Sequence, residues 1–114
     1  MYSYHRVFHR HLEEEIGRSV RANRPLSLLL IDVDDFKAMN DSFGHIVGDH
    51  VLASIGQVLR TQTPSFEMVG RLGGDEFAVL LPDTQPSETA VVAERLRHEA
   101  SEAVEFPVTY RASA

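Results

Sequence analysis

The chain has 114 residues, of which 43% are hydrophobic and 25% are charged, a composition typical of one soluble globular domain. Its formal net charge of −6 argues against the broad basic surface that binds nucleic acid, so we expect no nucleic-acid partner. The absence of cysteine excludes disulfides and thiolate metal sites, and we expect a cytoplasmic location. No apolar run approaches the roughly 20 residues that span a bilayer, so we expect no direct membrane contact from this segment.

The first predicted element is a helix from Tyr4 to about Val20. On its solvent face, Glu14 and Arg18 stand in the favourable i, i+4 order for an ion pair. Pro25 then breaks the helical pattern before the next strand. The apolar residues recur every four positions and form a single stripe, which comprises Tyr4, Phe8, Leu12, Ile16 and Val20.

A continuous apolar run, Leu28 to Ile31, predicts a central strand that is buried on both faces. The run ends in an acidic segment that begins with Asp32, so carboxylates are expected at the edge of a sheet. A second acidic segment lies farther along the chain and contains Asp75. Because both segments end or begin strands, Asp32 and Asp75 can share one divalent metal ion. Oxygen ligands without cysteine favour magnesium or manganese over zinc.

The second acidic segment lies between two strand-like runs, Phe66 to Leu72 and Glu76 to Leu81. Gly73 and Gly74 between them predict a two-residue hairpin turn, where the phosphates of a ligand can approach bare backbone. With this turn, alternate strand residues would place Asp75 on one face and Glu76 on the other. The two acids would then not both face the same metal ion.

Three further helices and one strand are predicted around these segments. A short helix runs from Phe36 to Phe43 and stops at Gly44, and a longer one runs from about His50 to Gln62, with Asp49 as a possible N-cap. The buried side of the longer helix is predicted to comprise Leu52, Ile55, Val58 and Leu59. The next helix spans about Ser87 to Ala103, and its buried side is predicted to comprise Val92, Ala93, Leu96, Ala100 and Ala103. A strand then begins at Phe106–Tyr110.

Two other metal sites are disfavoured by the sequence. His5 and His9 are one helical turn apart, but no cluster of further ligands accompanies them, so we interpret them as solvated residues. A calcium loop that starts at Asp32 would need glycine at its sixth position, where this chain has Lys37.

The order of elements, α-β-α-α-β-β-α-β, predicts a single α+β domain over residues 1–114, with a mostly antiparallel central sheet flanked by helices. No internal repeat, linker or low-complexity tract interrupts it.

Two motifs resemble one known family. The run DVDDFKAMNDSFGH (residues 32–45), followed by Gly48-Asp49 and then by RLGGDEF (residues 71–77), is similar to the GGDEF family of diguanylate cyclases. The resemblance implies the palm-like nucleotidyl cyclase fold. It covers nearly the whole chain but not the whole family domain, so we expect a chain truncated at both ends, most seriously at the C-terminus, where a final helix and strand section would be absent.

The resemblance also implies a role for each matching residue. Asp75, Glu76 and Lys37 take catalytic positions, with Lys37 meeting phosphate. Asp32, Asp75 and the Val33 carbonyl would hold Mg²⁺ or Mn²⁺. The remaining matches bind substrate: Asn40 and Asp49 select guanine, and Phe36, Gly73 and Gly74 line the nucleotide site.

The implied activity is bacterial second-messenger synthesis, in which two GTP molecules become cyclic di-GMP and two pyrophosphates. One domain presents one GTP, so a homodimer is expected, with an upstream sensor domain in a parent protein whose membrane attachment is left open. The fragment alone is expected to be inactive or slow. The alternative is a non-catalytic regulatory module that binds GTP or cyclic di-GMP.

One departure from the family bears on regulation. Many members carry an R-x-x-D product-binding site shortly before the signature. Pro64 and Glu67 stand at its Arg and Asp positions here, so product inhibition through that site is expected to be absent or weak.

Overall fold

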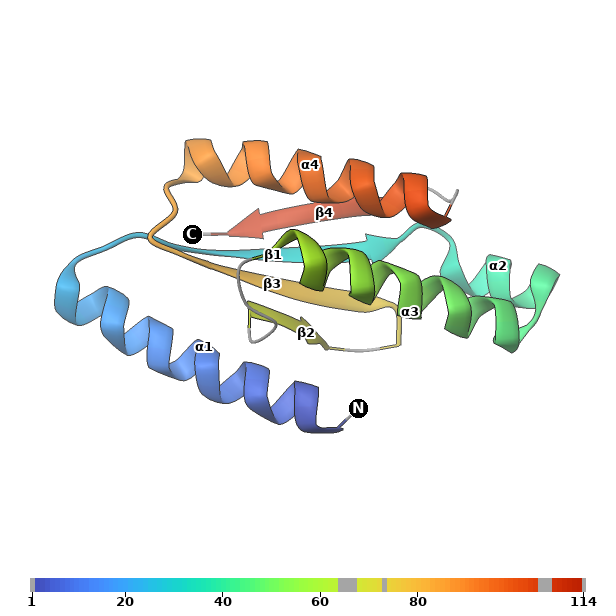
Figure 1. Cartoon of the computed structure of the whole chain (residues 1–114), viewed down its shortest axis with the longest axis horizontal. Helices are drawn as coiled ribbons and strands as arrows, with labels where there is room; N and C mark the ends of the chain where they lie inside the picture. Colours follow the sequence, from blue (N-terminus) through green and yellow to red (C-terminus); the bar gives the residue numbers. More distant parts are fainter. Residues whose placement is uncertain (1, 64–67, 73, 105–107, 114) are drawn as a thin grey trace.

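The computed structural model describes residues 2–63, 68–72, 74–104 and 108–113 (Figure 1). Within these ranges the strands form one four-stranded sheet in the order β2-β3-β1-β4, and every pair is antiparallel. The predicted α+β class and order of elements are therefore confirmed. The elements are α1 (Tyr2–Ala22), β1 (Leu26–Val33), α2 (Phe36–Phe43), α3 (His45–Gln62), β2 (Val69–Arg71), β3 (Glu76–Pro82), α4 (Pro86–Val104) and β4 (Val108–Ser113).

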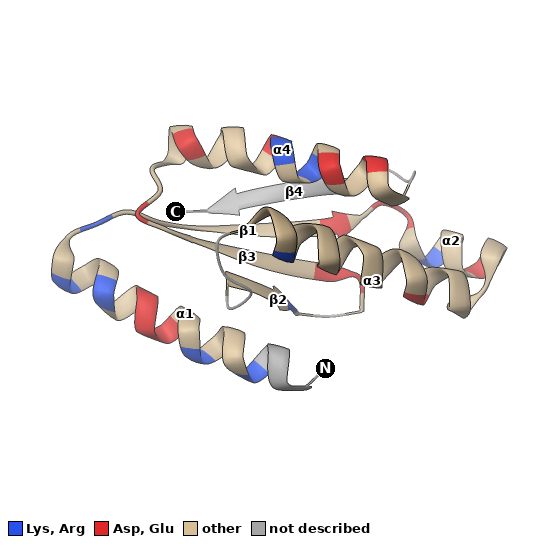
Figure 2. Ribbon diagram, viewed as in Figure 1, with Lys and Arg blue, Asp and Glu red and all other residues tan. Residues whose placement is uncertain are grey.

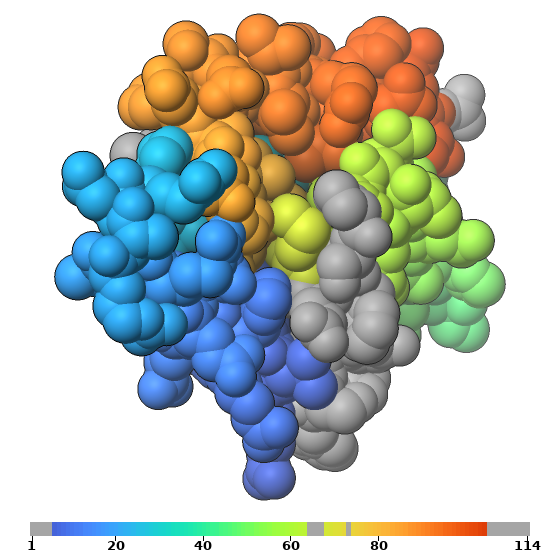
Figure 3. All heavy atoms as spheres, turned by 60° about the vertical axis from the view of Figure 1, so that its left-hand side comes forward, coloured from blue at the N-terminus to red at the C-terminus, as the bar shows by residue number. Residues whose placement is uncertain are grey.

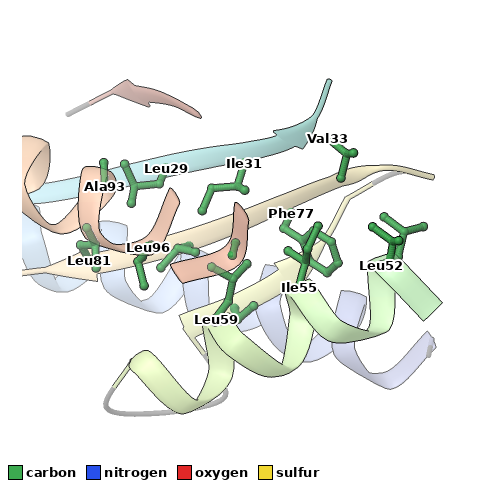
Figure 4. Packing of buried hydrophobic residues seen from close by; sticks show 14 of the residues in the cluster. Leu29, Ile31, Val33, Leu52, Ile55, Leu59, Phe77, Leu81, Ala93 and Leu96 are labelled. Atoms are coloured by element: carbon green, nitrogen blue, oxygen red, sulfur yellow. The ribbon is translucent and has the colours of Figure 1, made fainter. Parts of the chain in front are cut away.

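The larger core lies between the sheet and the two helices α3 and α4 (Figure 1). Figure 4 shows Leu29 and Ile31 of β1 pointing toward Ile55 of α3 and Leu96 of α4. Alternate β1 residues are buried, as expected of a strand whose side chains point to opposite faces. Of the predicted buried residues of α4, Ala103 is exposed, whereas Thr89, which the pattern did not include, is buried.

The opposite face of the sheet is covered by α1 alone among the described helices. Phe8 of α1 is buried against Ala78 and Leu80 of β3, and α1 approaches β2 so closely that a Cβ at Gly70 would lie 2.5 Å from the Phe8 ring. One helix does not cover four strands, so alternate β1 residues on this face, Leu26, Leu28 and Leu30, are only half-buried. The prediction that β1 is buried on both faces is therefore wrong for the α1 face.

The predicted apolar stripe of α1 is buried only in part. Phe8 is 1% exposed, but Ile16 is 47% and Val20 is 77% exposed, because the second half of the helix extends past the apolar face of the sheet. None of the described helices is long and apolar enough to cross a membrane.

An ion-pair cluster fixes the C-terminal end of α1. Arg18 Nη2 lies 2.9 Å and Arg24 Nε 2.5 Å from the Asp83 carboxylate, in the turn after β3. Figure 3 shows the end of α1 and this turn in contact on the molecular surface. Arg18 Nε also binds Glu15 at 3.1 Å, so the predicted pairing of Arg18 with Glu14 is wrong. The two guanidinium groups lower the pKa of Asp83.

Some predicted boundaries also change. The helix α3 begins at His45 and not at His50, so Asp49 lies in its second turn and is not its N-cap. Gly44, with φ of +91°, ends α2 and begins α3. The predicted strand residues Phe66 and Phe106, together with Pro64 and Glu67 of the R-x-x-D comparison, lie outside the described residues.

Candidate functional site

The sheet brings acidic residues from two strands together at one end. Asp32, near the end of β1, is the direct cross-strand partner of Glu76, the first residue of β3. Directly opposed residues in an antiparallel pair project from the same face of the sheet. Figure 2 shows these acidic positions side by side at the end of β1 and the start of β3. Asp75 belongs to the turn immediately before β3 and lies close enough to Asp32 to raise the pKa of the Asp32 carboxyl.

The turn differs from the predicted two-residue hairpin. The Leu72 N–H donates to the Glu76 carbonyl at 2.9 Å, so the loop between them contains residues 73–75. The predicted two-residue turn is therefore wrong: the alternation of faces begins at Glu76, and Asp75 lies in the turn, where strand alternation does not fix its direction. Gly74 is exposed, and no atom lies within 4 Å of the place where its Cβ would be, which leaves the backbone open to a ligand. Gly73 lies outside the described residues.

The electrostatics of Asp32 favour a cation. Burial raises the pKa of Asp32, and the negative charges of Asp75 and Glu76 raise it further, against an opposing hydrogen bond from the Val33 backbone. Asp32 Oδ1 is buried and has no hydrogen-bond partner among the described residues. An unpartnered buried oxygen close to two other negative charges is costly, and a bound metal ion would supply the missing interaction. The residues present therefore fit a divalent cation.

The ligand set would be small. Within the described ranges, no group of three or more His, Asp or Glu side chains is suited to hold a metal ion. The predicted set contains two side chains, Asp32 and Asp75, and one backbone oxygen, that of Val33. The structure brings the two side chains together and places Val33 next to Asp32 at the end of β1.

The other predicted site residues follow on α2 and α3. The helix α2 begins only three residues after Val33, so Phe36, Lys37 and Asn40 are tied closely to the acidic end of β1. Lys37 and Asp49 are exposed, whereas Phe36 and Asn40 are half-buried. Asn40 Oδ1 is a second buried oxygen without a hydrogen-bond partner in the described part of the chain.

One residue of the motif to which the sequence analysis assigned no role lies against Asn40. Gly48, in the first turns of α3, packs directly on the Asn40 side chain and faces the ring of Phe36. A glycine within a helix is the signal that could have indicated this contact, since alanine is preferred there unless something approaches the helix closely.

Comparisons with known proteins point to one family. A family model described as diguanylate cyclase, GGDEF domain, matches residues 4–113. Diguanylate cyclase DosC of Escherichia coli is 42% identical over 85 residues, which are 75% of this chain and 18% of DosC. This chain thus spans about a fifth of the length of that curated relative.

Solved structures match over most of the chain. The GGDEF domain of YfiN, also called TpbB, from Pseudomonas aeruginosa gives a TM-score of 0.79 at 32% identity and covers 88% of this chain and 68% of that one. The active GGEEF domain of a diguanylate cyclase from Vibrio cholerae gives a TM-score of 0.73 at 31% identity and covers 87% of this chain and 66% of that one.

Proposed function

This chain belongs to the GGDEF domain family of diguanylate cyclases, and from that premise we propose that it provides one GTP half-site for cyclic di-GMP synthesis. The observation that supports this most strongly is the pairing of Asp32 with Asp75 and Glu76 across β1 and β3. A cluster of like charges is unfavourable in the empty protein, and a metal ion with a triphosphate makes it favourable.

The reaction has a defined chemical balance. The 3′-hydroxyl of one GTP attacks the α-phosphorus of the other, a new P–O bond forms, and pyrophosphate leaves as its bond to that phosphorus breaks. A second such step closes the ring. Chemistry of this kind depends mainly on positioning and on charge neutralisation. A divalent ion, Mg²⁺ or Mn²⁺, would supply this by offsetting the triphosphate charge and lowering the pKa of the attacking hydroxyl.

The acidic end of the sheet holds the reacting groups. Asp32 and Asp75 would hold the cation through their carboxylates, and the Val33 carbonyl would add a third oxygen. Glu76, on the same face as Asp32, accepts the proton of the attacking hydroxyl.

The exposed groups nearby hold the phosphates. Lys37 projects from the first turn of α2 and is exposed, so its ammonium is free to meet a phosphate oxygen. Gly73 and Gly74 let the triphosphate approach the loop backbone, and around Gly74 this space is open.

The α2–α3 pair selects the base. Asp49 accepts from the N1–H and the exocyclic amine of guanine, a pair of donors that adenine does not present, and Asn40 binds a neighbouring base atom. Phe36, whose ring lies against Gly48 between these two residues in sequence, contributes apolar surface to the site.

Catalysis needs a second copy of the chain. One half-site binds one GTP, so two copies must face each other before either hydroxyl reaches the other α-phosphorus. We further propose that a sensor domain in the parent protein controls this meeting, and that the reaction takes place in the cytoplasm.

The test is product analysis with the domain extended at its C-terminus to the length expected for the family and held as a dimer by a fused coiled coil. GTP and Mg²⁺ are incubated with the wild type and with Asp75→Ala, and the nucleotides are separated by chromatography. We expect cyclic di-GMP from the wild type and a loss of at least about a hundredfold with Asp75→Ala. GTP that binds but stays intact in the wild type would contradict catalysis and favour a regulatory binding module.

A further inference from the structure

Gly48 of α3 packs directly against two residues of α2, Asn40 and Phe36. A Cβ at this position would stand 1.8 Å from Asn40 Oδ1, 2.9 Å from Asn40 Cγ and 3.3 Å from Phe36 Cζ. The first two distances are far shorter than any normal carbon contact. Only glycine at position 48 is therefore compatible with the observed place of the Asn40 amide.

The backbone itself does not require glycine there. Gly48 lies inside α3, and among the described glycines only Gly44 has a positive φ. Glycine is less favourable than alanine in the interior of a helix. The close approach of Asn40 is thus the feature of this structure that explains the glycine.

Three interactions join Asn40, Gly44 and Gly48. The Gly44 N–H donates to the Asn40 backbone carbonyl at 2.7 Å, and the Gly48 N–H donates to the Gly44 carbonyl at 3.1 Å. The third is the packing of Asn40 Oδ1 on the Cα of Gly48, where a C–H group faces the oxygen. The Asn40 carbonyl is thereby occupied, and its side-chain oxygen is enclosed.

This enclosure orients the amide. Because Oδ1 is buried against Gly48, the Nδ2 group is the polar part of Asn40 that remains to meet a ligand. Together, the Asn40 Nδ2 group and the Asp49 carboxylate present one hydrogen-bond donor and one acceptor to a base. Guanine offers the complement, the O6 acceptor next to the N1–H and N2–H donors, whereas adenine offers a donor and an acceptor in the opposite order.

We propose that Gly48 is a positioning residue that fixes the orientation of the Asn40 amide and, through it, the preference for guanine over adenine. This inference rests on the proposed function, in which Asn40 and Asp49 bind the base. Gly48 itself does not touch the nucleotide.

The variant Gly48→Ala tests the proposal in the 114-residue chain. Two quantities are measured: the NMR resonances of the Asn40 side-chain NH₂ group, and the affinities for fluorescent derivatives of GTP and ATP with Mg²⁺ present. We expect the added Cβ to displace the amide, shift its resonances, and reduce the ratio of GTP to ATP affinity by about fivefold or more, which is the effect of losing one hydrogen bond.

A double-mutant cycle isolates the contact. In an Asn40→Ala background the added methyl meets no amide oxygen, so Gly48→Ala should change the affinity ratio no further. The matched control is Gly17→Ala in α1, where the new Cβ meets only the flexible end of Arg21, at 3.0 Å. This control should leave the Asn40 resonances and the affinity ratio as in the wild type.

Each other outcome has a distinct meaning. If Gly48→Ala leaves the amide resonances and the affinity ratio unchanged, the inference is wrong. If Gly48→Ala does not fold, recovery of folding in the double variant supports the contact, and failure to recover overturns it. If Asn40→Ala keeps the wild-type ratio of GTP to ATP affinity, or if the wild type does not bind GTP, then base recognition as proposed fails. In that case the amide resonances still decide whether Gly48 holds Asn40.

Discussion

At the end of the sheet, Asp32 of β1 lies opposite Glu76 of β3 and near Asp75 of the turn before β3. The pKa of Asp32 is raised by burial, by Asp75 and by Glu76. An acid whose pKa is higher in the folded state than in the unfolded state binds its proton more tightly when folded. The contribution of Asp32 to the free energy of unfolding is therefore fully present at acidic pH, where the carboxyl is protonated. It is lost as the pH rises through the pKa of the folded state.

The variant Asp32→Asn should accordingly be more stable than the wild type at pH 7 when no metal is present. Relief of like-charge repulsion between cross-strand neighbours is worth roughly 0.2–1 kcal/mol, which raises Tm by a few degrees in a domain of this size. Thermal unfolding in EDTA from pH 3 to 8 measures it. The difference should vanish near pH 3, and a variant that is less stable than the wild type at pH 7 would contradict the account.

Individual residues of the site could be predicted from sequence where chemistry and position coincide. Asp32 ends an apolar run and Asp75 follows two glycines, so the sequence places each of them at the end of a strand, whereas their meeting depends on the pairing of β1 with β3. The length of the turn before β3 was mispredicted, because it contains three residues and not two, which makes Asp75 a turn residue and not a strand residue. Gly48 was missed, since its importance depends on where α2 lies in space.

At the scale of elements, α1 is attached to the sheet by two different means. Phe8 packs on β3 near the start of the helix, and Arg18 reaches Asp83 near its end. Asp83 has φ of +56°, a backbone conformation that asparagine also adopts readily. Asparagine at this position thus removes the charge without straining the turn.

The variant Asp83→Asn should loosen the C-terminal half of α1. Because Arg18 and Arg24 lower the pKa of Asp83, their contribution is present above the unfolded pKa of about 3.9 and is lost as the pH falls through the folded pKa. We expect a decrease in Tm of at most about 4 °C at pH 7 and low salt, since the pairs are exposed. The decrease should disappear in acid and shrink in 1 M NaCl.

Hydrogen exchange locates the effect within the chain. Amides of residues 15–22 should exchange faster in Asp83→Asn, while those of β1 and β3 keep wild-type protection. Equal exchange of α1 in both proteins would show that the Asp83 ion pairs do not hold this helix.

Element types could be predicted more reliably than element ends. The period of apolar residues gave all of the helices and strands that the structure describes, in the right order. Two errors arose where local and tertiary signals differ. Asp49 resembles an N-cap locally, yet the helix begins at His45 because Gly44 makes the turn. Ile16 and Val20 continue the apolar stripe of α1, yet the sheet does not extend beneath them.

At the scale of the whole molecule, the site depends on strands that are distant in sequence. Asp32 and Glu76 are 44 positions apart in numbering, and the register of β1 with β3 places them opposite each other. The central position of β1, between β3 and β4, holds that register from both sides. The nucleotide site is therefore a property of the assembled sheet and not of either motif alone.

The measurement that tests this account most directly is the binding of Mn²⁺ in the presence of a non-hydrolysable GTP analogue. Binding is monitored in electron paramagnetic resonance as a loss of the signal from free Mn²⁺. We expect the wild type and Gly17→Ala to bind Mn²⁺ together with the analogue. The variants Asp32→Asn and Asp75→Asn should each weaken Mn²⁺ binding by about tenfold or more, because each removes one anionic oxygen ligand. Wild-type Mn²⁺ affinity in both variants would show that the acidic ends of β1 and β3 do not form the metal site.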